Sequence, residues 1–109
     1  MLCGPDLNKY LYKLGFSQKD VNEILDTMRS GKWKYLTFAI DYRGKALEWD
    51  GYSEPPLGVF SHVIAHRLIQ SYRRVIYKVE LWEIVSPECI KLIDSKGMLG
   101  MIGRGLEIM

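Results

Sequence analysis

The spacing of apolar residues changes along this chain, and the change limits which folds are open to it. Before residue 30 the apolar positions recur every three or four residues, which is the period of an amphipathic helix. From Trp33 onward, and again over residues 75–85, they recur every second residue, which is the period of a half-buried strand. The chain is therefore expected to fold as an α+β protein.

Two helices are expected in the first third of the chain. The first covers residues 6–14 and ends at Gly15. The second begins after Ser17, because Asp20 follows three residues later in the arrangement of a capping box. Gly31 closes this second helix. The pattern predicts an N-terminal αα-corner.

A three-stranded sheet is expected to follow the corner, in a single domain that covers residues 1–109. A right-handed crossover through a long helix would place the third strand beside the first and antiparallel to it. The predicted sheet is antiparallel or mixed, of type ββαβ with strand order 2-1-3, and the helices lie on one face. The expected elements are strands at 33–42, 45–49 and 75–85, a long crossover helix at 57–74 and a short C-terminal helix at 87–96.

Composition excludes intrinsic disorder as the main state, because 48% of the residues are hydrophobic and 26% are charged. No apolar run approaches the roughly 18 residues of a membrane span, and the first residues do not resemble a secretory signal. The protein is expected to be soluble and cytoplasmic, with no membrane partner. Cys3 and Cys89 are too few for a disulfide framework or a tetrahedral zinc site. We expect both to be ordinary thiols, with Cys89 in the core.

No stretch of the sequence carries a catalytic motif that would favour an enzyme. His62 and His66 are spaced as a metal-binding pair on a helix, but Val63 stands where a metalloprotease has its glutamate. No third ligand is suggested downstream. A non-catalytic protein with no cofactor and no metal is therefore the favoured interpretation.

Residues 11–25 resemble the helix-turn-helix motif of DNA-binding proteins. The likeness rests on Leu11, on Gly15 at the turn, and on Val21 and Ile24 at the spacing of that family's core. It implies that the second helix would lie in the major groove. The Leu-Gly-Phe-Ser run inside the same segment also resembles ubiquitin-associated domains, and a structural αα-corner is the favoured reading of the two helices.

The predicted long helix carries a cationic face without any carboxylate. Such a face can meet phosphates or an acidic protein surface. Its polar positions, opposite the apolar stripe, are His62, His66, Arg67, Gln70, Arg73 and Arg74.

Strand alternation predicts that several side chains face away from the helices on an open face of the sheet. Aromatic and arginine side chains are enriched at protein interfaces. The side chains expected on that face are Tyr35, Lys78, Glu80 and Trp82.

These features favour a small regulatory or inhibitory binding protein that docks on a macromolecular partner. The partner is expected to be a protein with an acidic surface. The predicted partner-binding residues are Tyr35, Trp82, Arg67, Arg73, Arg74 and Lys78.

The alternative is a nucleic-acid-binding protein that uses the basic face of helix 57–74 or the helix-turn-helix-like segment 11–25. The residues expected to contact nucleic acid in that case are Gln18, Lys19, Asn22, His66, Arg67, Gln70, Arg73 and Arg74.

The tail at 98–109 is rich in glycine and methionine. We expect it to cross the protein's own core, with a homodimer formed through the tail as the alternative.

Overall fold

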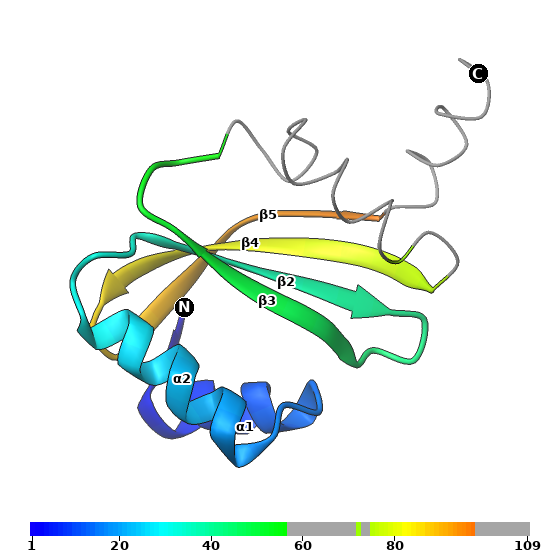
Figure 1. The fold of residues 1–109 in the computed structure, drawn as a ribbon, viewed down its shortest axis with the longest axis horizontal. Helices are drawn as coiled ribbons and strands as arrows, with labels where there is room; N and C mark the ends of the chain where they lie inside the picture. The colour runs from blue at the N-terminus through cyan, green and yellow to red at the C-terminus, as the bar shows by residue number, and fades with distance from the viewer. Residues whose placement is uncertain (57–71, 73–74, 98–109) are drawn as a thin grey trace.

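A computed structural model describes residues 1–56, 72 and 75–97 of the chain, which form an antiparallel sheet with two helices on one face (Figure 1). The sheet has five strands in the order β1-β5-β4-β2-β3. The elements in chain order are β1 (Leu2–Cys3), α1 (Gly4–Lys13), α2 (Gln18–Arg29), β2 (Tyr35–Asp41), β3 (Ala46–Tyr52), β4 (Ile76–Ser86) and β5 (Cys89–Gly97).

The two helices form the predicted αα-corner. Ser17 caps α2, because its Oγ accepts a hydrogen bond of 3.1 Å from the backbone N–H of Asp20. Gly15 lies in the turn with φ of +90°, a conformation that favours glycine. A side chain there would also meet Lys45, whose Cδ lies 3.3 Å from the position of a Cβ. The predicted end of the first helix at Gly15 and the predicted start of the second helix at Ser17 are therefore confirmed.

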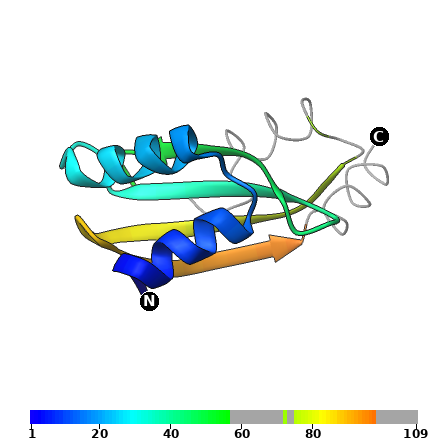
Figure 2. The same cartoon turned by 90° about the horizontal axis from the view of Figure 1, so that it is seen from below.

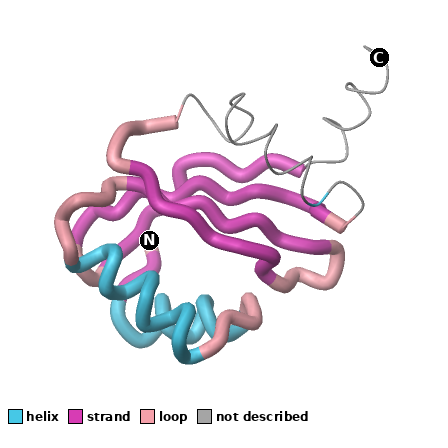
Figure 3. The backbone as a smooth tube through the Cα atoms, viewed as in Figure 1, coloured by secondary structure: helices cyan, strands magenta, loops and turns pink. Residues whose placement is uncertain are grey.

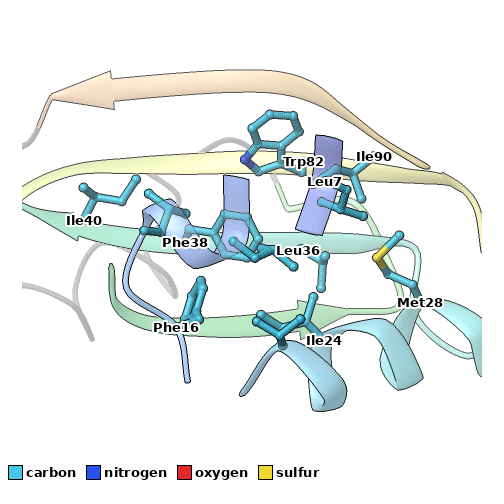
Figure 4. Packing of buried hydrophobic residues seen from close by; sticks show 12 residues of the cluster. Leu7, Phe16, Ile24, Met28, Leu36, Phe38, Ile40, Trp82 and Ile90 are labelled. Atoms are coloured by element: carbon cyan, nitrogen blue, oxygen red, sulfur yellow. The ribbon is translucent and has the colours of Figure 1, made fainter. Parts of the chain in front are cut away.

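Both helices pack on the same face of the sheet, as Figure 2 shows from below. The core lies between these two layers, and Figure 4 shows its packing. Leu36, Phe38 and Ile40 of β2 point into it, as the two-residue period predicts. The buried residues of this core are Leu7, Leu11, Leu14, Phe16, Val21, Ile24, Met28, Leu36, Phe38, Ile40, Trp82 and Ile90.

The opposite face of the sheet is also apolar at its centre. Ala39, Ile76, Val79 and Leu81 are buried there and form a second, smaller cluster. Half-buried side chains pack against that cluster, and Tyr72 is among them. The central strands β2 and β4 are therefore covered on both faces, so this sheet has no bare polar face at its middle.

The predicted fold class is wrong in the number of strands and in the C-terminal helix. The central pairings do agree with the predicted order, since β2 lies between β3 and β4 and is antiparallel to both. The sheet, however, extends beyond β4 to β5 and β1. The predicted crossover helix at 57–74, apart from Tyr72, and the tail at 98–109 lie outside the described residues.

The segment predicted as a short helix at 87–96 is β5, which pairs with β4 as a hairpin (Figure 3). Ser86 pairs with Cys89, so Pro87 and Glu88 form the turn rather than the first turn of a helix. Apolar residues at positions 90, 92 and 93 fit either a helix or a strand with one irregularity, and the spacing alone favours neither. Pairing with the long strand β4 decides the conformation.

Cys3 and Cys89 form a disulfide, so the prediction of two ordinary thiols is wrong. They face each other where β1 pairs with β5, with Cα atoms 4.2 Å apart. β1 has only two residues, too few to suggest a strand from its alternation. The sequence therefore gave no reason to place Cys3 beside Cys89, which is 86 residues away.

Neither described helix has the length and the apolar character needed to cross a membrane.

Candidate partner-binding surface

Two tyrosine rings lie in contact on the outside of the protein, at the end of the sheet where β2 turns into β3. The centroids of Tyr42 and Tyr77 are 5.2 Å apart, with the ring planes at 63°. Tyr42 is 57% exposed and Tyr77 is 46% exposed. Val75 and Arg43 are exposed beside them, and Tyr42, Arg43 and Val75 line a shallow hollow of about 160 Å³. We call Tyr42, Arg43, Val75 and Tyr77 the turn-end surface.

The turn that carries Tyr42 and Arg43 is held by a network of short hydrogen bonds. The Asp41 carboxylate accepts from the backbone N–H of Arg43 at 2.8 Å and of Lys45 at 3.0 Å. The Asp41 N–H donates to the Lys45 carbonyl at 2.8 Å, and the Asp41 carbonyl accepts from Gly44 at 3.1 Å. Gly44 has φ of +78°, as the last residue of a three-residue hairpin loop requires. Two residues of the turn-end surface, Tyr42 and Arg43, therefore belong to a preorganised turn.

These hydrogen bonds also set the ionisation of Asp41. The N–H of Lys45, and then that of Arg43, lower the pKa of the Asp41 carboxyl below its ordinary value of 3.8. The carboxylate is therefore ionised at neutral pH. Because the pKa is lowered in the folded state, the stabilisation is present at neutral pH and is lost as the pH falls through the lowered pKa.

β4 has an irregularity at Tyr77, whose side chain is exposed. Ile40 pairs with Lys78, but Asp41 pairs with Ile76, so Tyr77 is the extra residue of a β-bulge. Simple alternation would place Tyr77 on the same face as Val79, which is buried. The bulge brings Ile76 into the same cluster as Val79 although the two are three residues apart, and nothing in the sequence predicts where the bulge falls.

Positive charge collects around this end of the sheet. The Lys45 ammonium donates to the backbone carbonyl of Lys13, at the end of α1, at 2.9 Å. Arg43 lies in the same turn as Lys45, and its guanidinium is 3.9 Å from Asp41. The turn therefore carries two cations, Arg43 and Lys45, and one carboxylate, Asp41.

Trp82, predicted to lie on an open sheet face, belongs to the core under the helices. It is 6% exposed, and its ring centroid lies 5.6 Å from that of Tyr10 and 6.4 Å from that of Phe38. Alternation correctly separates Glu80 and Trp82 from Val79, but it does not say which face meets the helices. The prediction of an exposed Trp82 is therefore wrong.

A buried carboxylate accompanies Trp82. Glu80 Oε1 accepts from the Tyr10 hydroxyl at 2.5 Å and from Trp82 Nε1 at 3.1 Å. Its other oxygen lies 3.4 Å from the Lys78 ammonium. Burial, and then the hydrogen bond and charge of Glu80, raise the pKa of the Tyr10 hydroxyl, so it stays a donor. The network joins α1 to β4.

The other predicted partner-binding residues do not form one surface. Tyr35 is half-buried among the residues of the second cluster, whereas Lys78 reaches toward Glu80 under the helices. Arg67, Arg73 and Arg74 lie outside the described residues. The predicted combination of Tyr35 with Trp82 is therefore not present, because the two side chains lie on opposite faces of the sheet.

The residues of the nucleic-acid alternative are only partly described. Gln18, Lys19 and Asn22 are exposed on the first turns of α2. The Gln18 side chain forms two hydrogen bonds. It accepts from the Tyr12 hydroxyl of α1 at 2.6 Å and donates to the Asn22 side chain at 2.9 Å. The residues of this alternative that lie outside the described part are His66, Arg67, Gln70, Arg73 and Arg74; so does His62 of the predicted metal pair.

A larger hollow of about 310 Å³ lies where the start of α1 faces the β4–β5 turn. Its charged lining is mixed, because Arg29 and Glu88 have opposite signs. Arg29 also lies 3.7 Å from Asp26 on its own helix. The hollow therefore concentrates neither charge nor aromatic surface, in contrast to the turn-end surface.

No protein-family model, no curated protein and no solved structure shows a significant match to this chain.

Proposed function

We propose that this chain is a small non-catalytic binding protein, regulatory or inhibitory, that docks on a protein partner with an acidic surface. The turn-end surface makes the contact. The observation that carries the proposal is the pair of exposed, touching rings of Tyr42 and Tyr77 beside Arg43. Tyrosine and arginine are the residue types enriched among binding hot spots.

The local geometry supports a binding role because little has to be ordered when a partner arrives. Tyr42 and Arg43 stand on a turn already fixed by the Asp41 carboxylate. A tyrosine side chain also loses little conformational entropy on binding, since it has only two rotatable angles. Preorganisation of this kind raises affinity by lowering the entropy lost on association.

The size of a stable interface limits what these four residues can do. A typical interface buries about 800 Å² on each partner, from some 20–30 residues. The turn-end surface would therefore be the central anchor, surrounded by contacts of smaller energetic weight. The cations of the turn, Arg43 and Lys45, favour an acidic partner by electrostatic complementarity.

Single-stranded nucleic acid is the alternative partner, and the same rings favour it. Bases stack on exposed aromatic side chains, and cations next to such a platform attract the phosphate backbone. Tyr42 and Tyr77 with Arg43 have both features. The two candidates differ in the partner and not in the surface.

We also propose a cytoplasmic location. Disulfides are rare in the cytoplasm of mesophilic organisms. In that compartment Cys3 and Cys89 would be kept reduced.

The test is site-specific crosslinking followed by measured affinity. A photo-reactive phenylalanine analogue replaces Tyr42, Tyr77 or, as a matched control, Tyr12, which is similarly exposed but lies on α1. Crosslinking in a cell extract is expected from positions 42 and 77 to one and the same protein. Titration of that protein, once purified, is expected to show a loss of at least about 30-fold for Tyr42→Ala and none for Tyr12→Ala.

A labelled single-stranded DNA and a single-stranded RNA decide between the two partners. If the chain binds either strand with an affinity that falls steeply with salt and is lost in Tyr42→Ala, the partner is nucleic acid. If Tyr42→Ala and Tyr77→Ala bind every identified partner as the wild type does, the turn-end surface is not the binding site.

A further inference from the structure

One tryptophan of this protein lies on its surface, in the loop between α2 and β2. Trp33 is 38% exposed, whereas Trp49 is half-buried and Trp82 is 6% exposed. The Trp33 ring packs against Gly51 of β3, because its Cδ2 and Cε3 atoms are each 3.4 Å from the place where a Cβ on Gly51 would lie. Cδ2 is shared by both rings of the indole, so a neighbour at this distance lies over a ring face. One face of the ring therefore rests on the strand, and the other face is open.

The loop is held in place on both sides of this ring. Before the ring, Ser30 Oγ accepts a hydrogen bond of 3.3 Å from the N–H of Lys32. After it, the N–H of Lys34 donates to the Tyr52 carbonyl at 2.9 Å, and the Lys34 carbonyl accepts from the N–H of Ile84 at 2.8 Å. The backbone around the ring is therefore tied to both neighbouring strands, and little order has to be gained when a ligand binds.

Positive charge flanks Trp33. Lys32 and Lys34 are its neighbours in the sequence, and both are exposed. Neither forms an ion pair with any residue that the structure describes. No carboxylate occurs in the sequence between Asp26 and Asp41. An anionic ligand would therefore meet two ammonium groups beside an open aromatic face.

We propose that Lys32, Trp33 and Lys34 form a binding site for single-stranded nucleic acid, which we call the Trp33 site. An unpaired base stacks on the open face of the ring, and the phosphates next to that base contact the two ammonium groups. Stacking on aromatic rings and cations along the backbone are the two features by which proteins bind single strands without reading their sequence. A duplex fits poorly, because its bases are already stacked on one another and would have to be extruded.

A membrane surface is the other ligand that an exposed tryptophan beside lysines can meet. The packing of the ring favours nucleic acid instead. Because one face lies on Gly51, the indole presents a flat surface and does not project from the loop. Its neighbours in the sequence on both sides are lysines, so no apolar side chain next to Trp33 would enter the bilayer with it.

The Trp33 site is separate from the turn-end surface and does not rest on the proposed function. Trp33 precedes the start of β2, whereas Tyr42 follows the end of that seven-residue strand. The loop between α2 and β2 and the turn between β2 and β3 accordingly lie at opposite ends of the sheet (Figure 1). A variant of one surface is therefore expected to leave the other unchanged.

Fluorescence anisotropy with a labelled oligothymidylate of about twelve nucleotides tests the site. The wild type is expected to bind this single strand more tightly than its duplex with oligoadenylate. Trp33→Ala is expected to weaken binding at least about fivefold, because it removes the stacking surface. Trp33→Phe keeps a ring and is expected to lose less. Tyr42→Ala, at the turn-end surface, is expected to bind the single strand as the wild type does.

The salt dependence of binding tests the two lysines. Each phosphate contact with a single strand contributes about 0.7 to the slope of log affinity against log salt concentration. Lys32→Gln combined with Lys34→Gln is therefore expected to lower the slope by about 1.4. The matched control combines Lys9→Gln with Lys13→Gln, which removes the same charge from exposed positions of α1 and should leave the slope unchanged. Circular dichroism checks that all variants are folded.

Four results would overturn the proposal. One is a wild-type protein that binds neither oligothymidylate nor oligouridylate at low salt. Another is binding that Trp33→Ala leaves intact and Tyr42→Ala abolishes, which would place the strand on the turn-end surface. The third is an equal fall in slope for both lysine pairs, which would show an effect of net charge alone. The fourth is binding to vesicles that contain phosphatidylserine but not to either oligonucleotide, which would make the loop a membrane contact.

Discussion

Two groups of aromatic rings in this protein have similar contacts and opposite surroundings. The inner aromatic group is Tyr10, Phe16, Phe38 and Trp82, with neighbouring centroids 5.6–6.4 Å apart. The outer pair, Tyr42 and Tyr77, is as close at 5.2 Å. Ring contact alone therefore does not distinguish a core from a binding surface.

The polar atoms of the two groups make the difference. The Tyr10 hydroxyl and the Trp82 N–H both donate to Glu80, so the inner group has no unused donor there. The hydroxyls of Tyr42 and Tyr77 form no hydrogen bond with any described residue. A satisfied donor in a dry interior stabilises the fold, whereas an unused donor on an exposed ring remains available to a partner.

The largest expected effect separates the two groups by stability. Trp82→Ala is expected to lower the free energy of unfolding by about 3–5 kcal/mol, because it leaves a large cavity in the core and removes a partner of Glu80. Tyr77→Ala, on the surface, is expected to stay within about 0.5 kcal/mol of the wild type. Urea unfolding monitored by circular dichroism measures both. Equal losses in the two variants would remove the distinction between inner and outer rings.

A somewhat smaller loss is expected when the disulfide is removed. Reduction, or the double substitution Cys3→Ser and Cys89→Ser, is expected to lower the free energy of unfolding by about 2–4 kcal/mol, since a long loop of unfolded chain is no longer closed. Thermal unfolding with and without a dithiol reductant measures the loss. The double variant should be indifferent to the reductant.

The same experiment sharpens the comparison between the two groups. α1 follows Cys3 directly and supplies Tyr10 to the inner group. Reduction should therefore broaden the fluorescence emission spectrum of Trp82 in the inner group. Partner binding through Tyr42 should be unchanged. If reduction weakens partner binding without changing the fluorescence of the inner group, the turn-end surface depends on the disulfide.

The smallest of the three effects concerns Tyr10→Phe, which removes one hydroxyl and keeps the ring. It is expected to lower the free energy of unfolding by about 1.5–3 kcal/mol, because Glu80 loses a hydrogen bond while it stays buried. Burial raises the pKa of Tyr10 in the folded state above its ordinary value of 10.0. Its contribution is therefore complete below pH 10 and declines above it. Urea titrations at pH 8 and above pH 10 should show that decline in the wild type but less of it in Tyr10→Phe.

The parts of the fold that the sequence predicts are those decided by neighbours along the chain. Ser17 and Gly15 mark the ends of the two helices, and the alternation around Phe38 marks the central strand. These features depend on hydrogen bonds and periodicities that a few consecutive residues determine. The structure confirms them for that reason.

The features that sequence reasoning missed depend on residues far apart in the chain. Trp82 shows this best. Alternation predicts that Trp82 lies in a strand and shares a face with Glu80, but it does not predict whether the helices cover that face. The side of the sheet on which α1 and α2 pack decided whether Trp82 would be core or surface. The Tyr77 bulge and the β5 strand likewise follow from pairing with distant residues. The sequence predicts a turn at Arg43-Gly44, and the aromatic residue next to this pair, Tyr42, which the structure places in the turn, is the sequence sign of the turn-end surface.

The pairing of Cys3 with Cys89 has a consequence for the order in which the molecule is made. The ribosome adds 85 residues between Cys3 and Cys89, which are 86 positions apart in the sequence. α1 is thus synthesised well before the covalent bond next to it can form. Until β5 exists, β1 has no strand to pair with. The start of α1 therefore remains without this covalent link until β5 has been synthesised.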